Sequence, residues 1–502
     1  MILLLSIFLP IIFFYFLHKT RKTTKSNLPP GPPRLPLIGN LHQLATAGDL
    51  HFYLWRLSKK YKSPIIHMKL GSRPLIVVSS PKLAKEVLQT QDLAFCRRPK
   101  STCMQKLTYQ YSDITFSPCN DYWREMRKIT SIHLLSSKKV QSFRPIREHE
   151  ISLMTAKISK SASSHEVVNL SEMATALSSS LICRIAFGKR YYDHGSEMRR
   201  FKKLLEEFVA ITLTFFVSDY IPALGWVDKL VGSMKRLERI FENHDSFYQE
   251  LIDEHLDPRR AKKKEEEEDI LDTLIKLKED KSDVPFDLNW NSIKALLMNV
   301  FLAGAETTAT STIWVMTALI KAPDVMKKLQ LEIRNSIGKK GKVDEDDLPK
   351  LSYLRAVIME SFRLYPSIPL LVPRETIKKS ILDGYEIQPK TIVYVNAWAI
   401  SRDPEYWENP DEFIPERFLN TNIDLKGKDF GLTPFGSGRR ICPGMVMGLV
   451  NVELIVANLL YSVDWELPLG IRAEDVDTAS MPGLAVAKKN ALLLVPYKYR
   501  IV

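Results

Sequence analysis

The protein has 502 residues, of which 45% are hydrophobic and 5 are cysteine, and its 71 basic and 58 acidic side chains leave a formal charge of +13. This composition excludes an intrinsically disordered chain and a small disulfide-stapled one. The first 150 positions carry a charge of +16, and the remaining 352 carry −3. A basic excess confined to one end indicates a membrane surface or an acidic partner as readily as a nucleic acid.

The first 25 residues have the composition of a membrane anchor. Residues 2–17 form an apolar run of 16 residues, close to the shortest that spans a bilayer of about 30 Å. The basic side chains that follow it are His18, Lys19, Arg21, Lys22 and Lys25. A cleaved signal peptide has its charge before the apolar run and a small-residue cleavage site after it, and neither is present. Because basic flanks stay in the cytosol, we predict a single-pass anchor over residues 1–25 with a cytosolic catalytic domain.

A stiff segment and a short β region follow the anchor. Residues 26–40 contain five prolines, which exclude a helix and predict a hinge. Apolar residues flank a turn at residues 71–74, so we expect strands within residues 64–80. Residues 257–269 contain blocks of like charge and predict a solvated loop. Helical patterns dominate elsewhere without an internal repeat, and residues 41–502 are therefore predicted to form one large domain.

The segment from Asn289 to Leu319 is apolar on nearly every face, which predicts a helix through the middle of a large protein. Gly304 and Glu306 are unusual there, because glycine costs about 1 kcal/mol in a helix interior and a carboxylate is expensive in apolar surroundings. A local kink with a salt-bridged Glu306 is one explanation. The alternative, which we favour, is that Gly304 lets a flat ligand approach the backbone while Glu306 and Thr307 handle protons.

The five cysteines are odd in number and include no C-x-x-C pair, so neither a disulfide framework nor a zinc site is predicted. Cys442 differs from the others in having three glycines and two arginines close by, with Pro443 at the expected start of a helix. These neighbours favour the thiolate, which suits an axial iron ligand. Ile441 occupies the third glycine position of a dinucleotide loop, and Ser437 directly follows Gly436, so a hydrolase elbow is also excluded. A catalytic cysteine nucleophile stays open.

The cysteine loop resembles that of the heme-thiolate cytochromes P-450, whose pattern F-x-x-G-x-R-x-C-x-G is met by Phe435, Gly438, Arg440, Cys442 and Gly444. Other family segments are similar to Ala303–Thr308, Glu360–Arg363, Pro415–Phe418 and the pair Trp123 and Arg127. The resemblance covers nearly the whole chain. It implies a mainly α fold with a small β region, in which one heme domain follows the transmembrane anchor.

Within the family, the anchor, the proline segment and the cysteine loop resemble plant microsomal enzymes of the large specialised-metabolism clan. Residues 142–148 and 483–489 are similar to the branch that contains aldoxime-oxidising enzymes. Ala303 and Glu306 depart from that branch, whose members tend to have Pro and Asp at these positions.

The resemblance also implies the residue roles at the heme. Cys442 is the expected axial ligand of heme b iron, Phe435 lies beside the cofactor, and the expected propionate partners are Trp123, Arg127, Arg374 and Arg440. Bidentate pairing with carboxylates and a permanent charge suit arginine to this role. Core packing of Trp123 and a surface ion pair of Arg127 are the alternatives. Thr307 is expected to hold dioxygen at the heme, and Glu306 to relay protons as a general acid.

Two further groups of residues have expected roles. Glu360 and Arg363 share a helix face and, with Arg417, are expected to form a buried structural network that holds the heme-side core. Substrate contacts are expected from residues 95–119, 205–217 and 483–485. The individual pocket residues predicted are Phe301, Ala305, Ile368, Leu371, Val372 and Leu484. Because these positions are mostly apolar, the substrate is expected to be small, lipophilic and uncharged.

We therefore predict a monooxygenase of the endoplasmic reticulum membrane that uses O2 and NADPH to oxidise a plant metabolite. The chain has no flavin-binding region, so a separate cytochrome reductase is implied, and its candidate docking residues are Arg124, Arg127, Lys128, Lys138 and Lys139. Anchor, heme and reductase account for the positive charge, so no nucleic-acid partner is predicted. A reductase-independent isomerase or dehydratase and a non-catalytic heme binder are the alternatives.

Overall fold

The computed structural model describes residues 27–191, 196–260, 264–280 and 286–499, so the predicted anchor over residues 1–25 lies outside the described residues. Within the described ranges, no single helix is both long and apolar enough to cross a membrane. One pair of helices, Arg199–Tyr220 and Pro222–Leu230, has the required length and composition only when taken together, and it is bent by 109°.

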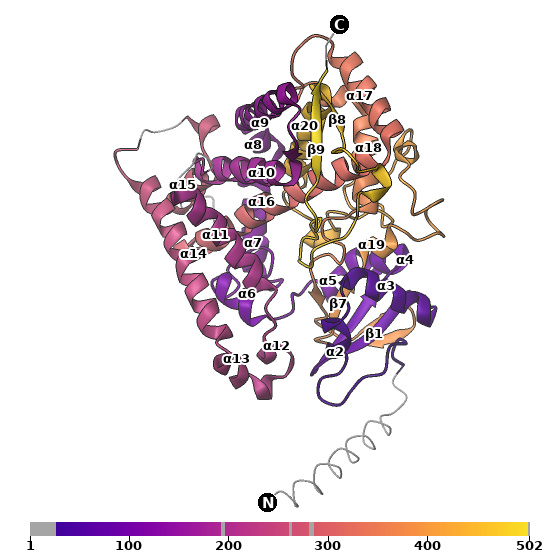
Figure 1. Ribbon diagram of the computed structural model, residues 1–502. Coiled ribbons are helices and arrows are strands. Elements are labelled where there is room, and N and C mark those ends of the chain that lie inside the picture. The colour runs from indigo at the N-terminus through magenta and orange to yellow at the C-terminus, as the bar shows by residue number, and fades with distance from the viewer. Residues whose placement is uncertain (1–26, 192–195, 261–263, 281–285, 500–502) are drawn as a thin grey trace, which may run out of the picture.

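Helices make up most of the described chain, as predicted (Figure 1). The first half contains α2 (Leu41–Ala45), α3 (Leu50–Tyr61), α4 (Pro81–Lys85), α5 (Asp92–Phe95), α6 (Thr102–Leu107), α7 (Asp121–Ile129), α8 (Ser137–Ser142), α9 (Arg144–Ser164), α10 (Leu170–Phe187), α11 (Ser196–Thr212), α12 (Val217–Tyr220), α13 (Trp226–Leu230) and α14 (Ser233–Leu256). The second half contains α15 (Ile270–Glu279), α16 (Trp290–Lys321), α17 (Pro323–Ile337), α18 (Ser352–Leu364), α19 (Ala397–Ile400) and α20 (Met445–Tyr461).

Nine short strands in the described part of the chain form three small sheets, which lie to one side of the helices and near the C-terminal end (Figure 1). The strands are β1 (Ile65–Leu70), β2 (Arg73–Val78), β3 (Val168–Asn169), β4 (Arg374–Glu375), β5 (Ser380–Leu382), β6 (Tyr385–Ile387), β7 (Ile392–Val395), β8 (Val463–Glu466) and β9 (Leu493–Lys498). The largest sheet has the order β1-β2-β7-β4, in which β2 pairs with β1 antiparallel and with β7 parallel. Both strands expected within residues 64–80 are therefore confirmed, and the buried run Leu75–Val78 is explained by the central place of β2.

The proline-rich segment is attached to the edge of β1. The backbone N–H of His67 donates to the carbonyl of Pro30 at 2.9 Å, and Asn40 exchanges hydrogen bonds with Lys69 at 2.6 and 2.8 Å. The His67 carbonyl also approaches Gly31 so closely that an added Cβ would lie 1.8 Å from its oxygen. The described part of this segment thus belongs to the folded body, and its role as a hinge stays a prediction.

Helix α16 runs through the middle of the molecule, as its sequence predicts (Figure 1). Asn289 begins it by accepting a hydrogen bond from the backbone of Ser292, which satisfies one of the free N–H groups of the first turn. From Thr308 to Ile320 every side chain is buried, because α10, α18 and α20 pack around this half. The turn before it, residues 302–307, is more open, and Ala303 in the middle of the helix is exposed.

Glu360, Arg363 and Arg417 form the buried network that the sequence predicts. Glu360 and Arg363 are both fully buried in α18, with 2.7 Å between Oε2 and Nε, and Arg417 Nε reaches Glu360 Oε1 at 3.1 Å. The remaining Arg363 donors bind the carbonyls of Ser401, Pro410 and Glu412. Every charge of the network is therefore compensated, and it fastens the segment before the cysteine loop to the helical core.

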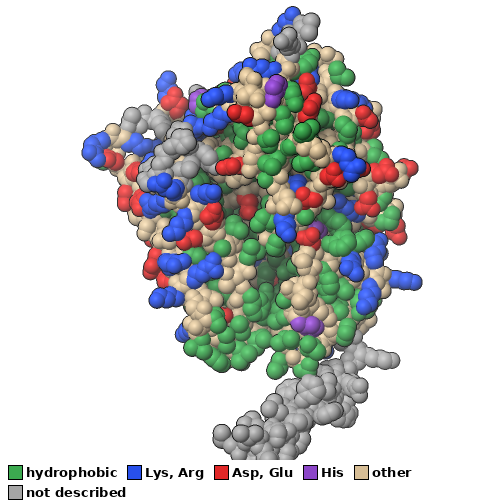
Figure 2. Space-filling model, in the orientation of Figure 1, with side chains coloured by type: hydrophobic (Ala, Val, Ile, Leu, Met, Phe, Trp, Pro, Cys, Tyr) green, Lys and Arg blue, Asp and Glu red, His purple; other side chains and the backbone are tan. Residues whose placement is uncertain are grey.

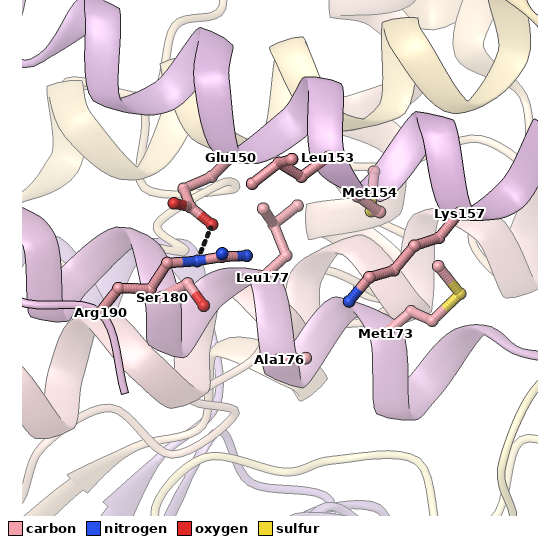
Figure 3. A pocket seen from close by; sticks show the side chains of 9 residues that line it. All are labelled: Glu150, Leu153, Met154, Lys157, Met173, Ala176, Leu177, Ser180 and Arg190. Carbon is pink, nitrogen blue, oxygen red and sulfur yellow. Dashed lines mark hydrogen bonds and ion pairs between the residues drawn. The ribbon is translucent and has the colours of Figure 1, made fainter. Parts of the chain in front are cut away.

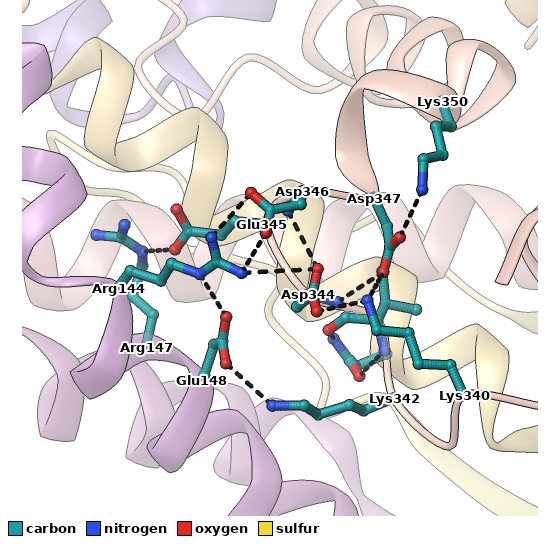
Figure 4. Close-up of polar contacts among 12 residues, drawn as sticks. Arg144, Arg147, Glu148, Lys340, Lys342, Asp344, Glu345, Asp346, Asp347 and Lys350 are labelled. Atoms are coloured by element: carbon teal, nitrogen blue, oxygen red, sulfur yellow. Dashed lines mark hydrogen bonds and ion pairs between the residues drawn. The ribbon is translucent and has the colours of Figure 1, made fainter.

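A second ionic network joins the start of α9 to the loop before α18 (Figure 4). Arg144 binds Glu148 at 2.7 Å and Asp346 at 2.8 Å, and the buried Arg147 binds Glu345 at 2.5 Å. On the other side, Lys340 and Lys350 both bind Asp347. Because Arg147 and Asp347 are buried, these contacts fix the loop more firmly than exposed pairs would.

We expect Glu360→Ala to lower the free energy of unfolding by about 3–5 kcal/mol, because Arg363 and Arg417 would lose their buried counter-charge. The variant should also retain little heme, measured as the heme-to-protein ratio beside a urea denaturation curve. Lys328→Ala is the control. It removes an exposed pair with Glu416 and should change stability by less than about 0.5 kcal/mol. Parental stability and heme content in Glu360→Ala would refute the structural role.

Candidate functional site

The open turn of α16 presents the two residues expected to handle protons. The Thr307 hydroxyl donates to the Ala303 carbonyl one turn earlier at 2.6 Å, which leaves its oxygen lone pairs available as acceptors. Glu306 has no ion pair or hydrogen bond among the described residues, and burial raises the pKa of its carboxyl. The salt-bridged Glu306 considered as an alternative is therefore absent from the described structure. A carboxyl whose pKa is raised by burial holds its proton more tightly than an exposed one, which suits it to general acid work.

Gly304 has a different role from the one predicted. A Cβ at this position would lie 2.5 Å from Ile182 Cδ1 of α10, and the Ser178 hydroxyl of the same helix donates to the Gly304 carbonyl at 2.9 Å. The glycine therefore admits a neighbouring helix, not a flat ligand. The expectation was wrong because the sequence of α16 does not reveal which of its faces meets α10.

The cysteine loop is held by backbone hydrogen bonds and by arginine side chains, of which Arg127 is the first. Cys442 donates its backbone N–H to the Phe435 carbonyl at 3.0 Å, and Arg127 of α7 donates to the Ile441 carbonyl. Gly438 has a φ of +70°, and an added Cβ would lie 2.0 Å from the Leu88 carbonyl oxygen, so only glycine fits. The Phe435 ring packs against Phe362 of α18 at 5.8 Å.

Cys442 lies just before α20, which begins at Met445 after Gly444. Pro443 therefore precedes the helix and is not its first residue, contrary to the prediction. Burial raises the pKa of the Cys442 thiol, while the Gly444 N–H and Arg127 act in the opposite direction. The Gly444 N–H and Arg127 therefore stabilise the thiolate, as expected, but by less than burial destabilises it. A bound metal cation would have to supply the remaining stabilisation.

Arg440 and Trp123 are buried together beside the cysteine loop. The Arg440 guanidinium stacks on the Trp123 ring at 4.1 Å and donates to the carbonyls of Cys96, Ile114 and Ser117. The Trp123 indole N–H also donates to the Ile114 carbonyl, at 2.9 Å. Burial lowers the pKa of Arg440 to about 10, which still leaves it protonated near neutral pH.

Arg374 and Arg98 complete a cluster of buried cations with Arg440. Arg374 is 4% exposed and donates one bond to the Ser437 carbonyl, while its buried Nη1 has no partner among the described residues. Burial, followed by repulsion from Arg440, lowers the pKa of Arg374 to about 10. Arg98 was missed by the sequence analysis. The nearby Asp113 supplies one carboxylate for three guanidinium groups, so a dianionic group fits this site.

Residues in or next to three of the segments expected to contact the substrate meet α16. The Ser311 hydroxyl of α16 meets that of Ser367 at 2.9 Å, and the Ser367 carbonyl accepts from Val486 at 2.8 Å. Asn299, also in α16, accepts from the backbone of Thr115. Arg98 connects two of the segments, because it donates to the carbonyls of Thr115, Val372 and Pro373. Three distant parts of the chain are thus brought to one helix.

Two of the predicted pocket residues have surroundings that the sequence did not indicate, and their place in the pocket stays a prediction. Phe301 is fully buried among Phe187, Phe201 and Phe247, with ring centroids 5.0–6.5 Å away, so it belongs to an aromatic core. Leu484 is 48% exposed and is not enclosed. In both cases an apolar side chain is compatible with core, pocket or surface, and the sequence could not distinguish them. Ala305, Ile368, Leu371 and Val372 stay predictions for the pocket.

Two of the predicted docking residues are also engaged within the protein. Arg127 points inward to the cysteine loop, and Lys139 donates to the Glu268 carbonyl at 3.0 Å. Arg124, Lys128 and Lys138 are exposed, so the basic surface is smaller than expected.

A pocket between α9 and α10 lies apart from all these residues (Figure 3). At one end Glu150, which is 2% exposed, accepts hydrogen bonds from Arg184 at 2.8 Å and Arg190 at 3.2 Å. These contacts neutralise the buried carboxylate and hold two helices together. We assign no catalytic role to this pocket.

Comparison with known proteins decides the family. The cytochrome P-450 family model matches residues 29–495. The chain belongs to the cytochrome P-450 family. It is a heme-dependent monooxygenase, and its cofactor is heme b.

Three plant enzymes illustrate how similar the relatives of this cytochrome P-450 are. It is 51% identical to a 6,7,8-trihydroxycoumarin synthase and 49% identical to a 5-OH-xanthotoxin synthase of Pastinaca sativa, each over 97% of this chain and 96% of the relative. A xanthotoxol synthase of the same plant is 45% identical over 99% and 98% of the two chains. These names do not test the resemblance to the aldoxime-oxidising branch, which stays a prediction.

The fold agrees with a solved structure. A zebra fish cytochrome P-450, described as a structure with abiraterone, covers 90% of this chain and all of its own with a TM-score of 0.74 and 24% identity. At that identity the similarity concerns the fold alone. It confirms the predicted mainly helical cytochrome P-450 fold with small sheets.

We expect Gly304→Ala to destabilise the protein by about 1–3 kcal/mol, because the new methyl group would collide with Ile182. In a double-mutant cycle, Ile182→Ala should relieve about 1 kcal/mol or more of this cost, measured by urea denaturation. Gly448→Ala in α20 is the matched control. Its nearest contact would be Phe435 Cε1 at 3.9 Å, so it should be neutral or slightly stabilising. Strict additivity of Gly304→Ala and Ile182→Ala would contradict this packing role.

Proposed function

We propose that this cytochrome P-450 hydroxylates a small, lipophilic, aromatic metabolite of the coumarin type. The similarity to the 6,7,8-trihydroxycoumarin synthase carries the proposal, because it extends over 97% of the chain at 51% identity. The mostly apolar segments around Ala305, Ile368 and Val372 suit such a flat, uncharged molecule.

The residues described above fit heme b. Cys442 would ligate its iron, and the cluster of Arg98, Arg374 and Arg440, with the unpartnered Nη1 of Arg374, would hold the propionates. Trp123 would support Arg440 by stacking, and Arg127 would position the ligand loop through Ile441. Phe435 would pack beside the cofactor. When bound, heme supplies the activation of O2.

Glu306 and Thr307 would supply the protons. Burial raises the pKa of the Glu306 carboxyl, which favours its protonated form and suits it to deliver a proton. The Thr307 hydroxyl donates its hydrogen to the Ala303 carbonyl. Its oxygen can therefore accept a proton from solvent, and the hydroxyl can pass its own proton on into the site. This pair argues against the isomerase or dehydratase alternative, because a reaction without O2 needs no such proton delivery.

Electrons would come from NADPH through a separate cytochrome reductase. Arg124 and Lys128 of α7, together with Lys138 of α8, are exposed on neighbouring elements and form the proposed basic docking surface. Arg124 and Lys128 also pair with Asp121 and Glu125 of the same helix, which reduces their net charge. An acidic partner would compete with these weak surface pairs.

We further propose that the protein lies on the endoplasmic reticulum membrane, with residues 1–25 as its anchor. Figure 2 shows hydrophobic side chains gathered at the lower end of the molecule, where α12 and α13 lie. The exposed apolar residues of this membrane-facing surface are Leu35, Leu37, Leu213, Phe215, Leu224, Trp226, Leu230 and Val231. Residues 35–38 and the segment that contains α12 both contact the β1–β2 turn. There the Gly71 N–H donates to the Ile38 carbonyl and the Ser72 N–H donates to the Tyr220 carbonyl.

The full-length enzyme, combined with a plant cytochrome reductase in microsomes, should add one oxygen atom to at least one coumarin-type compound. Products would be measured by mass spectrometry across a panel that also contains aldoximes and aliphatic alcohols. A reduced carbon-monoxide difference spectrum should first report thiolate ligation, which Cys442→Ser should abolish. Conversion without NADPH would favour an isomerase or dehydratase, thiolate ligation without any turnover would favour a heme binder, and oxidation of aldoximes alone would refute the substrate class.

Thr307→Ala should continue to oxidise NADPH but release peroxide in place of product, with product formation reduced about tenfold or more. NADPH consumption, peroxide and product would be measured in the same reaction. Thr307→Ser should restore coupling because it keeps the hydroxyl. Thr312→Ala is the matched control, since the Thr312 hydroxyl makes the same bond to a carbonyl one turn earlier but is buried away from the open turn. Unchanged coupling in Thr307→Ala would exclude the proposed role.

A further inference from the structure

Two cysteines that the predicted reaction does not use lie side by side near the arginine cluster. Cys96 follows α5, Cys119 precedes α7, and the two thiols interact with each other, while the Cys96 thiol also donates to the Leu93 carbonyl at 3.5 Å. Both are free in this structure. Cys96 is 1% exposed, whereas Cys119 is partly exposed, so only Cys119 can be reached directly from solution.

The two segments are held together independently of the thiols. Arg440 Nε donates to the Cys96 carbonyl at 3.1 Å, and Nη2 of the same guanidinium donates to the Ser117 carbonyl at 2.5 Å. One rigid, buried side chain therefore fixes the backbone on both sides of the cysteine pair.

The surrounding charges give the two thiols different reactivity. The hydrogen bond from Cys96, followed by the charges of Arg440, Arg439 and Arg124, lowers the pKa of Cys119 to about 6. The same hydrogen bond and burial raise the pKa of Cys96. Two of these arginines also face carboxylates, since Arg439 binds Asp92 and Arg124 binds Asp121. Cys119 has the character of an attacking thiolate, and Cys96 that of a resolving thiol.

We propose that Cys96 and Cys119 are a reversible oxidation site that forms a disulfide when the enzyme meets peroxide. The Cys119 thiolate attacks one peroxide oxygen, which breaks the O–O bond and gives a sulfenic acid and hydroxide. The Cys96 thiol then displaces the hydroxyl group, and its proton leaves with it as water. Two thiols lose two electrons in total, and one peroxide is reduced to two waters.

The position of the pair connects this modification to the heme site. The disulfide would close residues 96–119 into a loop, and this loop contains Arg98 and the backbone acceptors of Arg440. It would also remove the Cys119 thiol, whose ionised form Arg440 stabilises. Peroxide is the product expected when monooxygenase turnover is uncoupled, so the oxidant would arise close to the site.

The test treats the full-length heme enzyme with a small excess of hydrogen peroxide and blocks free thiols with iodoacetamide. After trypsin, the peptides 86–97 and 107–124 should appear as one cross-linked species, which dithiothreitol separates. Cys119→Ser should abolish the cross-link, and Cys96→Ser should leave a sulfenic acid on Cys119 that dimedone traps. Cys103→Ser is the matched control, because that buried cysteine should leave the cross-link intact. Free Cys96 and Cys119 after peroxide, or a different cross-linked pair, would overturn the proposal.

The rate of alkylation provides a second test that needs no oxidant. Cys119 should react with iodoacetamide with a pH midpoint of about 6, and at pH 6 it should react about tenfold faster than Cys103. Peptide mass spectrometry would measure both rates in the same sample. A midpoint near the ordinary thiol value of about 8.5 would contradict the assigned role of Cys119.

Discussion

Arg440 lies two residues before Cys442, and its buried guanidinium meets more of the site than any other side chain described above. It stacks on Trp123 and donates to the carbonyls of Cys96, Ile114 and Ser117. A buried cation needs compensation, and here backbone carbonyls, Asp113 and a thiolate provide it. The same constraint brings Arg374 and Arg98 to a place where only a polyanionic ligand completes the charge balance. The proposed heme site is thus built around an excess of buried positive charge.

Helix α16 meets two opposite requirements on its two sides. Along most of its length it packs against other helices, and Gly304 permits α10 to approach without a clash. At residues 302–307 the other side stays open and carries Thr307 and the isolated carboxyl of Glu306. Close packing on one side holds the reactive side rigid, which is what a positioned proton donor requires. The fully compensated Glu360 network does the same for the chain that leads into the cysteine loop.

The proposed heme site and the proposed oxidation site at Cys96 and Cys119 lie close together in this fold. The cysteine pair shares Arg440 with the heme site, so a change at the thiols alters the charge next to the propionate partners. The exposed apolar surface at α12 and α13 is joined to the β1–β2 turn by the hydrogen bond from Ser72 to the Tyr220 carbonyl.

Features that depend on local pattern could be predicted from the sequence. The cysteine loop, the strands of residues 65–78, the long helix from Asn289 and the pairing of Glu360 with Arg363 all follow from residue types at fixed spacing, because neighbours along the chain make these structures. The family and the class of reaction followed from them as well. The tertiary structure alone decided which face of a helix meets which partner. It placed Gly304 against Ile182, Phe301 in an aromatic core, Arg127 at the cysteine loop and Cys119 next to Cys96. The sequence could not show these contacts, because each of them joins residues far apart in the chain.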